Sequence, residues 1–283
     1  MIIAMDLGAT EIKVAPVNNG KMGKTLKVPT NADGGAQAIT QALHRAVALI
    51  PEKAEGLAVA TAGTVDEKAC KITFATQNLP GMTGFDFRRF FANAFPVSVI
   101  NDAHAALLGE MYFGAGKKLL DKRVAMLTLG SGVGGAYWKN GSLCADQSND
   151  FARFGHVTLK RNGRKCTCGK LGCVETYLSG RAMHRDAAKL GIEGSAFDTN
   201  CCDVPANAIF LARIRQYLAA ALKKINALCP FDAVIIGGGA ADWMGDCFGK
   251  VTAGIGYRVI RASLGNDAGL YGAWAHWQEE NNV

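Results

Sequence analysis

The sequence predicts an α/β protein made of two similar domains with a cleft between them. A strand, a glycine turn, a second strand and an Asn-Gly pair follow one another twice, at residues 2–20 and again at residues 124–141. Each copy is followed by apolar runs of strand length that alternate with helical patterns, which is the order of elements in α/β folds. Self-similarity on this scale indicates an internal duplication, and a cleft between two such halves is a common place for a small-molecule site.

The elements predicted for the first half alternate between strand and helix. Apolar residues at helical spacing predict a helix over residues 36–50, and short buried strands are predicted at 57–61 and 96–100. A helix over 103–112 follows the second of these strands. The region 63–95 lacks a regular pattern, so we expect it to form loops near the substrate.

The second half ends with a similar set of elements. A long helix is predicted over 207–228, because apolar residues share one face there and Pro230 follows. A strand at 233–236 runs into three consecutive glycines at 237–239. A last helix is predicted over 268–277 and closes the chain.

The composition is that of an ordinary globular chain of 283 residues, with 49% hydrophobic and 19% charged residues. Nothing at the N-terminus resembles a secretory signal and no apolar run has membrane-spanning length, so neither secretion nor a membrane location is expected. Nine cysteines without such a signal fit a reducing compartment, and we expect a cytoplasmic protein. The net charge of +7 is dispersed, so nucleic-acid binding is not expected, although this charge suits an anionic substrate such as a nucleotide.

A cluster of metal-binding residue types is the most specific feature of the chain. His156, Cys166, Cys168 and Cys173 fall within eighteen residues, with glycines among them. Three thiolates and one imidazole form a closed tetrahedral set that suits Zn²⁺, and because four ligands leave no open position the zinc would be structural. A disulfide with bystander residues and a group of buried free thiols are the alternatives. Chemistry close to this loop would then belong to other residues, such as Glu175.

Glycine turns and one carboxylate point to phosphate chemistry. A turn without Cβ atoms lets backbone N–H groups approach a phosphate closely. Asp6 stands beside the first turn, where a carboxylate would repel phosphate unless a divalent cation lay between them, so Asp6 is predicted to hold Mg²⁺ through water. The alternative is that Asp6 only accepts an ordinary hydrogen bond within the turn. The P-loop pattern is missing from the sequence, and no Gly-x-Gly-x-x-Gly pattern opens a helix as a dinucleotide-binding fold requires, which excludes these two classes.

Asp102 is the candidate general base. It follows the strand predicted at 96–100 and stands next to the polar Asn101, where an exposed carboxylate can accept a hydroxyl proton during phosphoryl transfer. Helix N-capping is the alternative role, because aspartate is a favoured N-cap residue and a helix is predicted directly after it. The conformation at the start of this helix distinguishes the two roles.

These motifs together resemble the ROK family of sugar kinases and sugar-responsive repressors, and the resemblance spans almost the whole chain. The cysteine cluster is highly specific, whereas the glycine turns also occur in the wider actin and hexokinase superfamily of ribonuclease H-like domains. The matching motifs are Asp6-x-Gly8-x-Thr10, Asn101-Asp102, the turn 130–135, Gly155-His156, Cys166-x-Cys168-Gly-x-x-Gly172-Cys173-x-Glu175 and Gly237-Gly238-Gly239.

The resemblance implies an ATP-dependent kinase with two actin- and hexokinase-like domains that close on a hexose. The N-terminal domain would comprise residues 1–113, joined by the C-terminal helix 267–283, and the C-terminal domain would comprise residues 114–266 with the zinc loop. Asp102 would take the proton from the sugar 6-hydroxyl group, which then attacks the γ-phosphate. Mg²⁺ and the phosphates would be bound by Asp6, Gly8, Ala9, Thr10, Gly130, Ser131, Gly132, Gly134 and Gly135, and adenosine by Gly237, Gly238 and Gly239.

The resemblance also implies a sugar pocket that the zinc loop supports. Its residues would be Gly63, Asn78, Asn101, His156 and Glu175, with one ring nitrogen of His156 on zinc and the other free to meet a sugar hydroxyl group. Loss of one thiolate is then expected to weaken sugar binding and to leave the ATP contacts unchanged.

Two positions depart from the family pattern. Glucokinase-like members carry Glu three residues before the zinc histidine, and this chain has Arg153 there, in the predicted substrate site. A guanidinium group only donates hydrogen bonds, so plain glucose fits less well, and an N-acetylhexosamine such as N-acetylmannosamine or an acidic sugar stays open; alternatively, Arg153 points into solvent. The second departure is Glu11, where many relatives carry Lys, and nearby Lys13 is expected to compensate in part.

Two other classes of function are considered. Family repressors carry a DNA-binding helix-turn-helix before the first strand, and here that strand begins at Ile2, so DNA binding is not expected. A non-catalytic, sugar-binding regulatory protein is the alternative function; Arg153 favours it, whereas Asp6 and Asp102 argue against it. Family members commonly form dimers, so a homodimer is expected by analogy.

Overall fold

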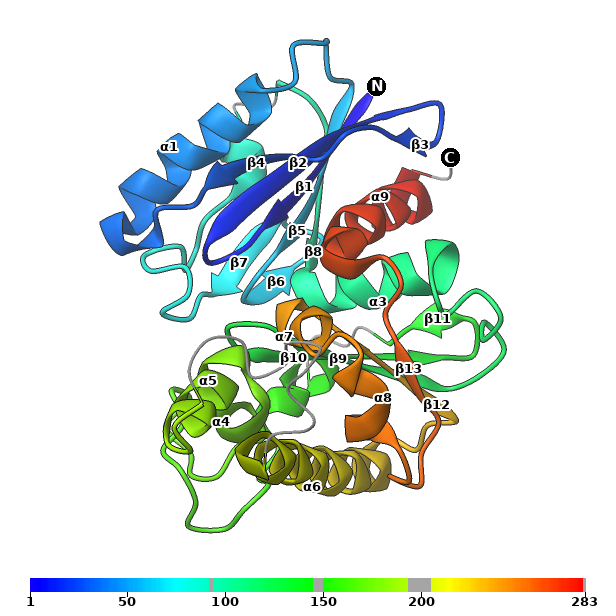
Figure 1. The fold of residues 1–283 in the computed structure, drawn as a ribbon. Helices are drawn as coiled ribbons and strands as arrows, with labels where there is room; N and C mark the ends of the chain where they lie inside the picture. Colours follow the sequence, from blue (N-terminus) through cyan, green and yellow to red (C-terminus); the bar gives the residue numbers. More distant parts are fainter. Residues whose placement is uncertain (92–93, 145–149, 193–204, 282–283) are drawn as a thin grey trace. The chain divides into compact units, whose positions relative to one another are not determined.

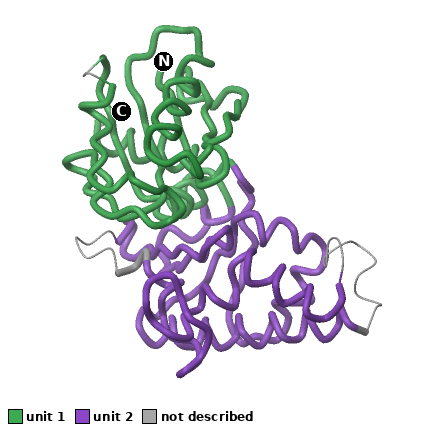
Figure 2. The backbone as a smooth tube through the Cα atoms, turned by 90° about the vertical axis from the view of Figure 1, so that its left-hand side faces the viewer, with its two compact units in different colours: residues 1–114, 267–283 green, residues 115–266 purple. Residues whose placement is uncertain are grey.

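The chain divides into two compact units (Figure 2). Each unit has its own main sheet and its own hydrophobic core. Unit 1 consists of Met1–Gly114 and Asp267–Val283, and unit 2 consists of Ala115–Asn266. The structure is a computed structural model, and it describes residues 1–91, 94–144, 150–192 and 205–281.

Unit 1 is built on a mixed six-stranded sheet with strand order β3-β2-β1-β5-β8, in which β4 also pairs with β2. Strand β1 is antiparallel to β2 and parallel to β5, and β5 is parallel to β8. Because β1, β5 and β8 run in the same direction, their carboxyl ends meet at one edge of the sheet. The strands are β1 (Ile2–Leu7), β2 (Glu11–Asn18), β3 (Lys21–Met22), β4 (Leu26–Pro29), β5 (Gly56–Thr61) and β8 (Val97–Asn101).

Helices cover both faces of this sheet (Figure 1). On one face lies α1 (Gly35–Ala48), whose apolar residues share a buried cluster with Met5 of β1. Successive side chains of a strand point to opposite faces, so Asp6 points to the other face. That face is covered by α3 (Asp102–Phe113) and α9 (Ala268–Asn281), and the first turn of α9 lies directly against the Asp6 carboxylate.

Unit 2 repeats the topology of unit 1. Its five-stranded sheet has strand order β11-β10-β9-β12-β13, with β10 antiparallel to β9 and β12 parallel to both β9 and β13. This order matches β3-β2-β1-β5-β8 strand by strand, which confirms the predicted duplicated α/β fold. The strands are β9 (Val124–Leu129), β10 (Val133–Lys139), β11 (Ser142–Leu143), β12 (Ala233–Gly237) and β13 (Val259–Arg261).

The helix α6 (Pro205–Leu228) supplies much of the core of unit 2. Its residues Ile214, Leu218 and Ile225 recur at helical spacing and are buried in one cluster with residues of β9 and β12. The helix ends before Pro230, as predicted, because a proline cannot continue it. Among the described residues of this unit, the other α-helices are α4 (Glu175–Leu178), α5 (Gly180–Ala188), α7 (Gly239–Trp243) and α8 (Cys247–Thr252), and a 3-10 helix spans Asp150–His156.

The elements that periodicity predicted are all present, with ends shifted by a few residues. The region 63–95 differs from the prediction of loops, because it contains the hairpin β6 (Thr64–Asp66) and β7 (Lys71–Phe74) and the short helix α2 (Phe87–Phe90). Elements this short show no period in the sequence. A local signal does exist at α2, since Asp86 caps this helix by accepting a hydrogen bond from the N–H of Arg89.

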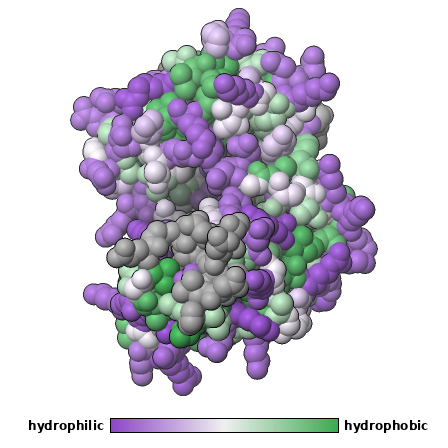
Figure 3. Space-filling view, in the orientation of Figure 1, coloured by the Kyte–Doolittle hydropathy of each residue, from purple (hydrophilic) through white to green (hydrophobic). Residues whose placement is uncertain are grey.

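Among the described residues, no helix is both long enough and apolar enough to cross a bilayer. Hydrophilic residues predominate on the face drawn in Figure 3, with apolar residues in small patches between them. Exposed large apolar side chains such as Phe74, Leu171 and Leu228 come from separate parts of the chain. Single exposed apolar residues of this kind are ordinary for a folded domain.

Helices α3 and α9 pack closely in unit 1 because glycines stand where they meet. A Cβ atom on Gly109 would lie 2.5 Å from the carbonyl oxygen of Ala268. A Cβ atom on Gly272 would overlap the carbonyl group of Ala105. The two backbones therefore approach each other at a distance that no larger residue permits.

We predict that Gly272→Ala lowers the free energy of unfolding by about 1–3 kcal/mol, because the added methyl group forces the two helices apart. The control is Gly249→Ala in α8, where a Cβ atom meets nothing within 4 Å. Alanine is the better helix former by about 1 kcal/mol, so the control should be neutral or stabilising. Thermal and urea unfolding followed by circular dichroism measure both effects, and equal stability changes in the two variants would contradict the packing argument.

Candidate active site

The residues predicted to carry chemistry in unit 1 lie at the carboxyl edge of its sheet. Strands β1, β5 and β8 end at Leu7, Thr61 and Asn101, and the pairing register places these ends side by side. Gly8 and Asp102 follow directly, and Gly63 follows Thr61 after one residue. Parallel strands of α/β sheets bind ligands at this edge, because the loops after the strands converge there.

Asp6 forms an ion pair with Lys13 inside unit 1. The register of β1 and β2 places the two residues opposite each other, and the Lys13 Nζ atom lies 3.2 Å from the Asp6 Oδ2 atom. Burial raises the pKa of the Asp6 carboxyl group above its ordinary value; the Lys13 charge and hydrogen bond partly offset this, and the charges of Glu11 and Asp267 add to it. The hydrogen bond that the Asp6 carboxylate accepts comes from Lys13 on the neighbouring strand.

The first turn of α9 completes the surroundings of Asp6. A Cβ atom on Gly269 would lie 2.8 Å from the Asp6 Oδ2 atom, so only glycine leaves room for the carboxylate there. The start of a helix also favours a neighbouring negative charge. Sequence reasoning missed Gly269, and its only signal was a glycine in the first turn of the last predicted helix.

The turn between β1 and β2 is held by Thr30, which sequence reasoning also missed. The Gly8 N–H donates to the Glu11 carbonyl at 3.2 Å, and the buried Thr30 donates from Oγ1 to the Gly8 carbonyl at 2.8 Å and from its N–H to the Thr10 carbonyl at 3.0 Å. The intervening Ala9 is partly exposed and Thr10 is exposed. The unusual Glu11 is paired with Lys27, whose Nζ atom lies 3.0 Å from Oε1.

Helix α3 is capped by Asn101 and not by Asp102. The Asn101 Oδ1 atom accepts hydrogen bonds from the N–H groups of Ala103 at 3.0 Å and His104 at 3.2 Å. Its Nδ2 atom donates to the Gly63 carbonyl at 2.9 Å and to the Asp102 Oδ1 atom at 3.0 Å. Asn101 is therefore the N-cap residue, and the capping alternative for Asp102 is wrong. The Asn101 side chain thus links the start of α3 to the Gly63 carbonyl group and to the Asp102 carboxylate.

The pKa of the Asp102 carboxyl group is raised. Burial and, to a smaller extent, the charge of Asp6 raise it to about 7, although hydrogen bonds from the Ala103 N–H and from Asn101 act in the opposite direction. A carboxyl group of this pKa exchanges a proton readily near neutral pH.

Asn78, which was predicted to belong to the sugar pocket, lies in the turn after β7. Its N–H donates to the Thr76 Oγ1 atom at 3.2 Å.

The glycine turn 130–135 lies at the carboxyl end of β9 in unit 2. The turn closes on itself through the Gly130 N–H, which donates to the Gly132 carbonyl at 3.0 Å. The start of α5 holds it from one side, because the Gly180 N–H donates to the Gly130 carbonyl and the Arg181 Nε atom donates to the Ser131 carbonyl, both at 2.8 Å. Gly134 and Gly135 already belong to β10 and pair with β9.

The three glycines at the end of β12 lie beside this turn. Gly237 pairs with Thr128 of β9, and Gly239 begins α7. Gly238 has a φ of 87° and packs so closely that a Cβ atom would lie 2.8 Å from the backbone N of Leu129. The two glycine segments therefore lie side by side at the carboxyl edge of the second sheet.

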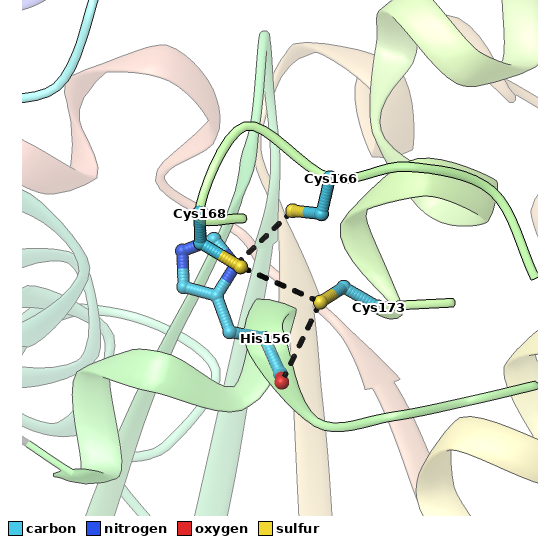
Figure 4. Close-up of side chains that lie close together, drawn as sticks. All are labelled: His156, Cys166, Cys168 and Cys173. Carbon is cyan, nitrogen blue, oxygen red and sulfur yellow. Dashed lines mark hydrogen bonds between the residues drawn. The ribbon is translucent and has the colours of Figure 1, made fainter. Parts of the chain in front are cut away.

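The predicted metal ligands converge in unit 2 (Figure 4). One ligand atom from each of His156, Cys166, Cys168 and Cys173 lies within 4.8 Å of the others. The Cys168 and Cys173 Sγ atoms are 3.6 Å apart, and the Cys166 Sγ atom is 3.6 Å from the His156 Nδ1 atom. In a tetrahedral zinc site with Zn–S distances of about 2.3 Å, neighbouring ligand atoms are about 3.6–3.8 Å apart.

The loop that carries these ligands is anchored to α5 by a buried ion pair. The Arg164 Nη2 atom donates to the Asp186 Oδ2 atom at 2.8 Å, and Asp186 is fully buried. The Arg164 guanidinium also lies 4.5 Å from the centre of the Tyr177 ring. Between the cysteines, the Cys166 N–H donates to the Lys170 carbonyl at 2.9 Å and closes the tight turn that presents two of the thiols.

Glu175 and Arg153 flank this loop in different environments. Glu175 begins α4, and its Oε2 atom accepts a hydrogen bond from the Val133 N–H at 3.0 Å. Arg153 is exposed, although Phe154 and Gly155 next to it are buried against β10.

The cysteines of this cluster, all within the described part of the chain, are free and form no disulfide bond. The disulfide alternative is therefore wrong.

Comparisons with known proteins agree with this architecture. A glucokinase of Streptomyces coelicolor is 30% identical over 311 residues, with 96% of each chain covered. An N-acetylmannosamine kinase of Haemophilus influenzae is 28% identical over 183 residues, which cover 64% of this chain and 60% of the relative. The crystal structure of a ROK family glucokinase from Streptomyces griseus in complex with glucose and AMPPNP matches with a TM-score of 0.81 at 30% identity and covers 99% of both chains.

The family evidence covers nearly the full length of the chain. The ROK family matches residues 2–280, which include both glycine turns, Asp102 and all four clustered ligands. Fold, motif order and overall similarity therefore agree, and the chain belongs to the ROK family.

Proposed function

We propose that the protein is an ATP-dependent kinase that transfers the γ-phosphate to the 6-hydroxyl group of a hexose or an N-acetylhexosamine. The observation that carries this proposal is the Asp102 carboxyl group, which is held by Asn101 at the start of α3 and has a pKa raised to about 7. A general base is most effective when its pKa lies near the working pH. Relatives named glucokinase and N-acetylmannosamine kinase support a sugar as the phosphate acceptor.

In the proposed reaction, Asp102 accepts the proton of the sugar hydroxyl group while the sugar oxygen forms a bond to the γ-phosphorus. The bond between that phosphorus and the bridging oxygen of ADP breaks, and the proton passes from Asp102 to solvent after the products leave. Asn101 orients the base by donating to its Oδ1 atom. The role of Asn101 in this scheme is to position Asp102 and the Gly63 loop, besides the sugar contact implied by the family.

Asp6 is the residue proposed to hold Mg²⁺ through water. The cation would neutralise charge between this carboxylate and the nucleotide phosphates. The charge of Lys13 favours the ionised carboxylate and opposes the effect of burial, which raises the pKa of Asp6. Lys13 thereby supplies, from the opposite strand, part of the positive charge that relatives carry at the position of Glu11.

Backbone groups of the glycine segments are proposed to bind ATP. The turn 130–135 would receive the phosphates and Gly237–Gly239 the adenosine, while Gly8, Ala9 and Thr10 would contribute from unit 1. Their places at the carboxyl edges of the two sheets support this assignment. The AMPPNP named for the Streptomyces griseus glucokinase supports ATP as the phosphate donor.

His156, Cys166, Cys168 and Cys173 are proposed to hold one structural Zn²⁺. Their mutual distances and soft ligand types fit a tetrahedral site, and the four ligands leave no position for a substrate. The Nδ1 atom of His156 faces the thiols, so its Nε2 atom is available to a sugar hydroxyl group. The ion itself supplies no chemistry beyond fixing this loop.

The sugar pocket is proposed to include Gly63, Asn78 and Asn101 from unit 1, and Arg153, His156 and Glu175 from unit 2. Arg153 stands where glucokinase-like relatives carry Glu and only donates hydrogen bonds, so an N-acetylhexosamine or an acidic sugar is proposed to fit better than plain glucose. A screen of ATP consumption with glucose, mannose, N-acetylglucosamine and N-acetylmannosamine identifies the acceptor.

A homodimer is proposed by analogy with the family. A cytoplasmic location is proposed because the nine cysteines suit a reducing compartment.

We predict that Asp102→Asn lowers kcat by about 10²–10⁴-fold, because the amide cannot accept the hydroxyl proton. Binding of the sugar and of AMPPNP, measured by calorimetry, should change little, since the side chain keeps its shape. Asp33→Asn, at an exposed carboxylate of the same unit, is the control and should retain full activity. Turnover of the Asp102 variant within a few fold of the unsubstituted protein would reject the assignment of the base.

The pKa of Asp102 also predicts how activity depends on pH. Its carboxylate form is the active base, and because burial raises its pKa to about 7, lowering the pH through this value protonates the base and removes activity. We expect kcat/KM for the sugar to fall about tenfold per pH unit below pH 7 and to level off above it. Measurements between pH 5.5 and 8.5 at saturating Mg-ATP test this, with circular dichroism as the control for folding; a level profile down to pH 5.5 contradicts it.

The zinc proposal predicts the metal content of the purified protein. Elemental analysis by mass spectrometry should find about one Zn²⁺ per chain. The Cys168→Ser variant should lose most of its zinc, because the hydroxyl group is a poor ligand for this ion. Cys168 is exposed, so this substitution does not disturb the core. Cys229→Ser is the control in the same unit and should retain its zinc. Full zinc content in the Cys168 variant would exclude this ligand set.

A further inference from the structure

We propose that Glu175 is a positioning residue that links the metal-binding loop (residues 156–173) to the glycine turn (residues 130–135). Occupancy of the metal site would thereby control nucleotide affinity. The inference rests on the proposed function in one respect, namely that the turn 130–135 binds the phosphates. It differs from the expectation that loss of a thiolate leaves the ATP contacts unchanged. The link lies entirely within unit 2.

The two oxygen atoms of the Glu175 carboxylate face two different structures. The Oε2 atom accepts the hydrogen bond from the Val133 N–H at 3.0 Å, at the end of the glycine turn. The Oε1 atom lies 3.5 Å from the Thr167 Oγ1 atom and 3.8 Å from the Cys166 Sγ atom, in the turn that carries two of the metal ligands. One side chain therefore contacts both the metal-binding loop and the turn.

Gly132 makes room for this contact. A Cβ atom at position 132 would lie 2.5 Å from the Glu175 Oε2 atom, so any other residue would displace the carboxylate from the Val133 N–H. The glycine therefore has a second reason to be there, besides close approach of the backbone to a phosphate. The turn and Glu175 are fitted to each other.

The backbone around Glu175 strengthens the link. Glu175 stands two residues after Cys173, and the Ser179 N–H donates to the Glu175 carbonyl at 3.2 Å. The next two residues, Gly180 and Arg181, donate to the carbonyl groups of Gly130 and Ser131. One continuous segment thus begins at a metal ligand and ends on the glycine turn.

This geometry gives the metal a route to the turn. With the ion bound, its ligands hold the turn of Cys166 and Thr167 and the start of α4 in one place, and Glu175 is fixed from both directions. Without the ion, three thiol groups and an imidazole have no common partner, and the supports of Glu175 loosen. The Val133 N–H then loses its carboxylate partner, and the turn is no longer held in a single conformation.

Nucleotide affinity measured with and without zinc tests the link. Zinc is removed with a chelator, the chelator is removed by gel filtration, and AMPPNP binding is measured by calorimetry with Mg²⁺ present. Coupled sites commonly change each other's affinity by about 5- to 150-fold. We expect zinc removal to raise the Kd for AMPPNP by about 5- to 20-fold in the unsubstituted protein, but by less than about 2-fold in Glu175→Ala, where the link is already cut. Glu175→Gln keeps an acceptor for Val133 and should restore part of the coupling.

The amide signal of Val133 in ¹⁵N NMR reports on the link without any nucleotide. It should shift, and its hydrogen should exchange faster, on zinc removal and in Glu175→Ala. The control is the Arg123 amide, which donates to the Asp232 carboxylate at 2.9 Å in the same unit, far along β9 from the turn, and which should not change. If the protein binds no AMPPNP either with or without zinc, the proposed function fails. The Val133 signal alone then decides whether the metal site is coupled to the turn.

Each outcome bears on the proposal. An unchanged Val133 amide on zinc removal, or the same loss of AMPPNP affinity in Glu175→Ala as in the unsubstituted protein, overturns it. If zinc removal unfolds unit 2, the Arg123 signal is lost as well, and the test moves to zinc-loaded variants. Thr167→Val, which removes the hydroxyl group beside Glu175, should then shift the Val133 amide, whereas Thr158→Val, at an exposed position of the same loop, should not; equal spectra of these two variants overturn the proposal.

Discussion

The burial of two neighbouring carboxylates is the constraint on which the site in unit 1 depends. Asp6 and Asp102 stand at the carboxyl edge of one sheet, and the charge of Asp6 makes ionisation of Asp102 more costly. Each carboxylate has a different stabilising partner. Lys13, opposite on β2, neutralises Asp6, while Asn101 and the N–H of Ala103 stabilise Asp102 by hydrogen bonds. Lys13 thereby opposes the rise in the pKa of Asp6, while the pKa of Asp102, at about 7, lies near neutral pH.

Unit 2 uses the same topology for a different purpose. Where β1 carries Asp6 before its glycine turn, β9 carries the uncharged Thr128 at the same place in the strand. The carboxylate beside the second turn comes instead from Glu175, which accepts a hydrogen bond from the Val133 N–H. The duplication has thus kept the strand order and changed the charge at the end of the first strand.

The second turn is held in place from the side of the metal-binding loop. Arg164 and the buried Asp186 fasten this loop to α5, and the first residues of α5 donate to the carbonyl groups of the turn. Glu175 occupies the junction of the two structures. A structural ion bound in this loop would therefore stabilise contacts beyond its four ligands, as the residues around metal sites usually do.

The sequence by itself determined the features that depend on local spacing. Helical and strand periods predicted the main elements, and the repeated hairpin predicted the duplicated fold. The spacing of His156 and the three cysteines predicted that these residues form one cluster. The sequence did not predict the short elements between 63 and 95, and it left the role of Asp102 open between base and helix cap. Only the tertiary structure decided that Asn101 is the cap, that Lys13 faces Asp6, that Gly269 of the last helix borders the same carboxylate, and that Glu175 reaches Val133. The physical reason is that these contacts depend on strand register and on helices distant in the chain, whereas a period or a ligand spacing is contained within a single segment.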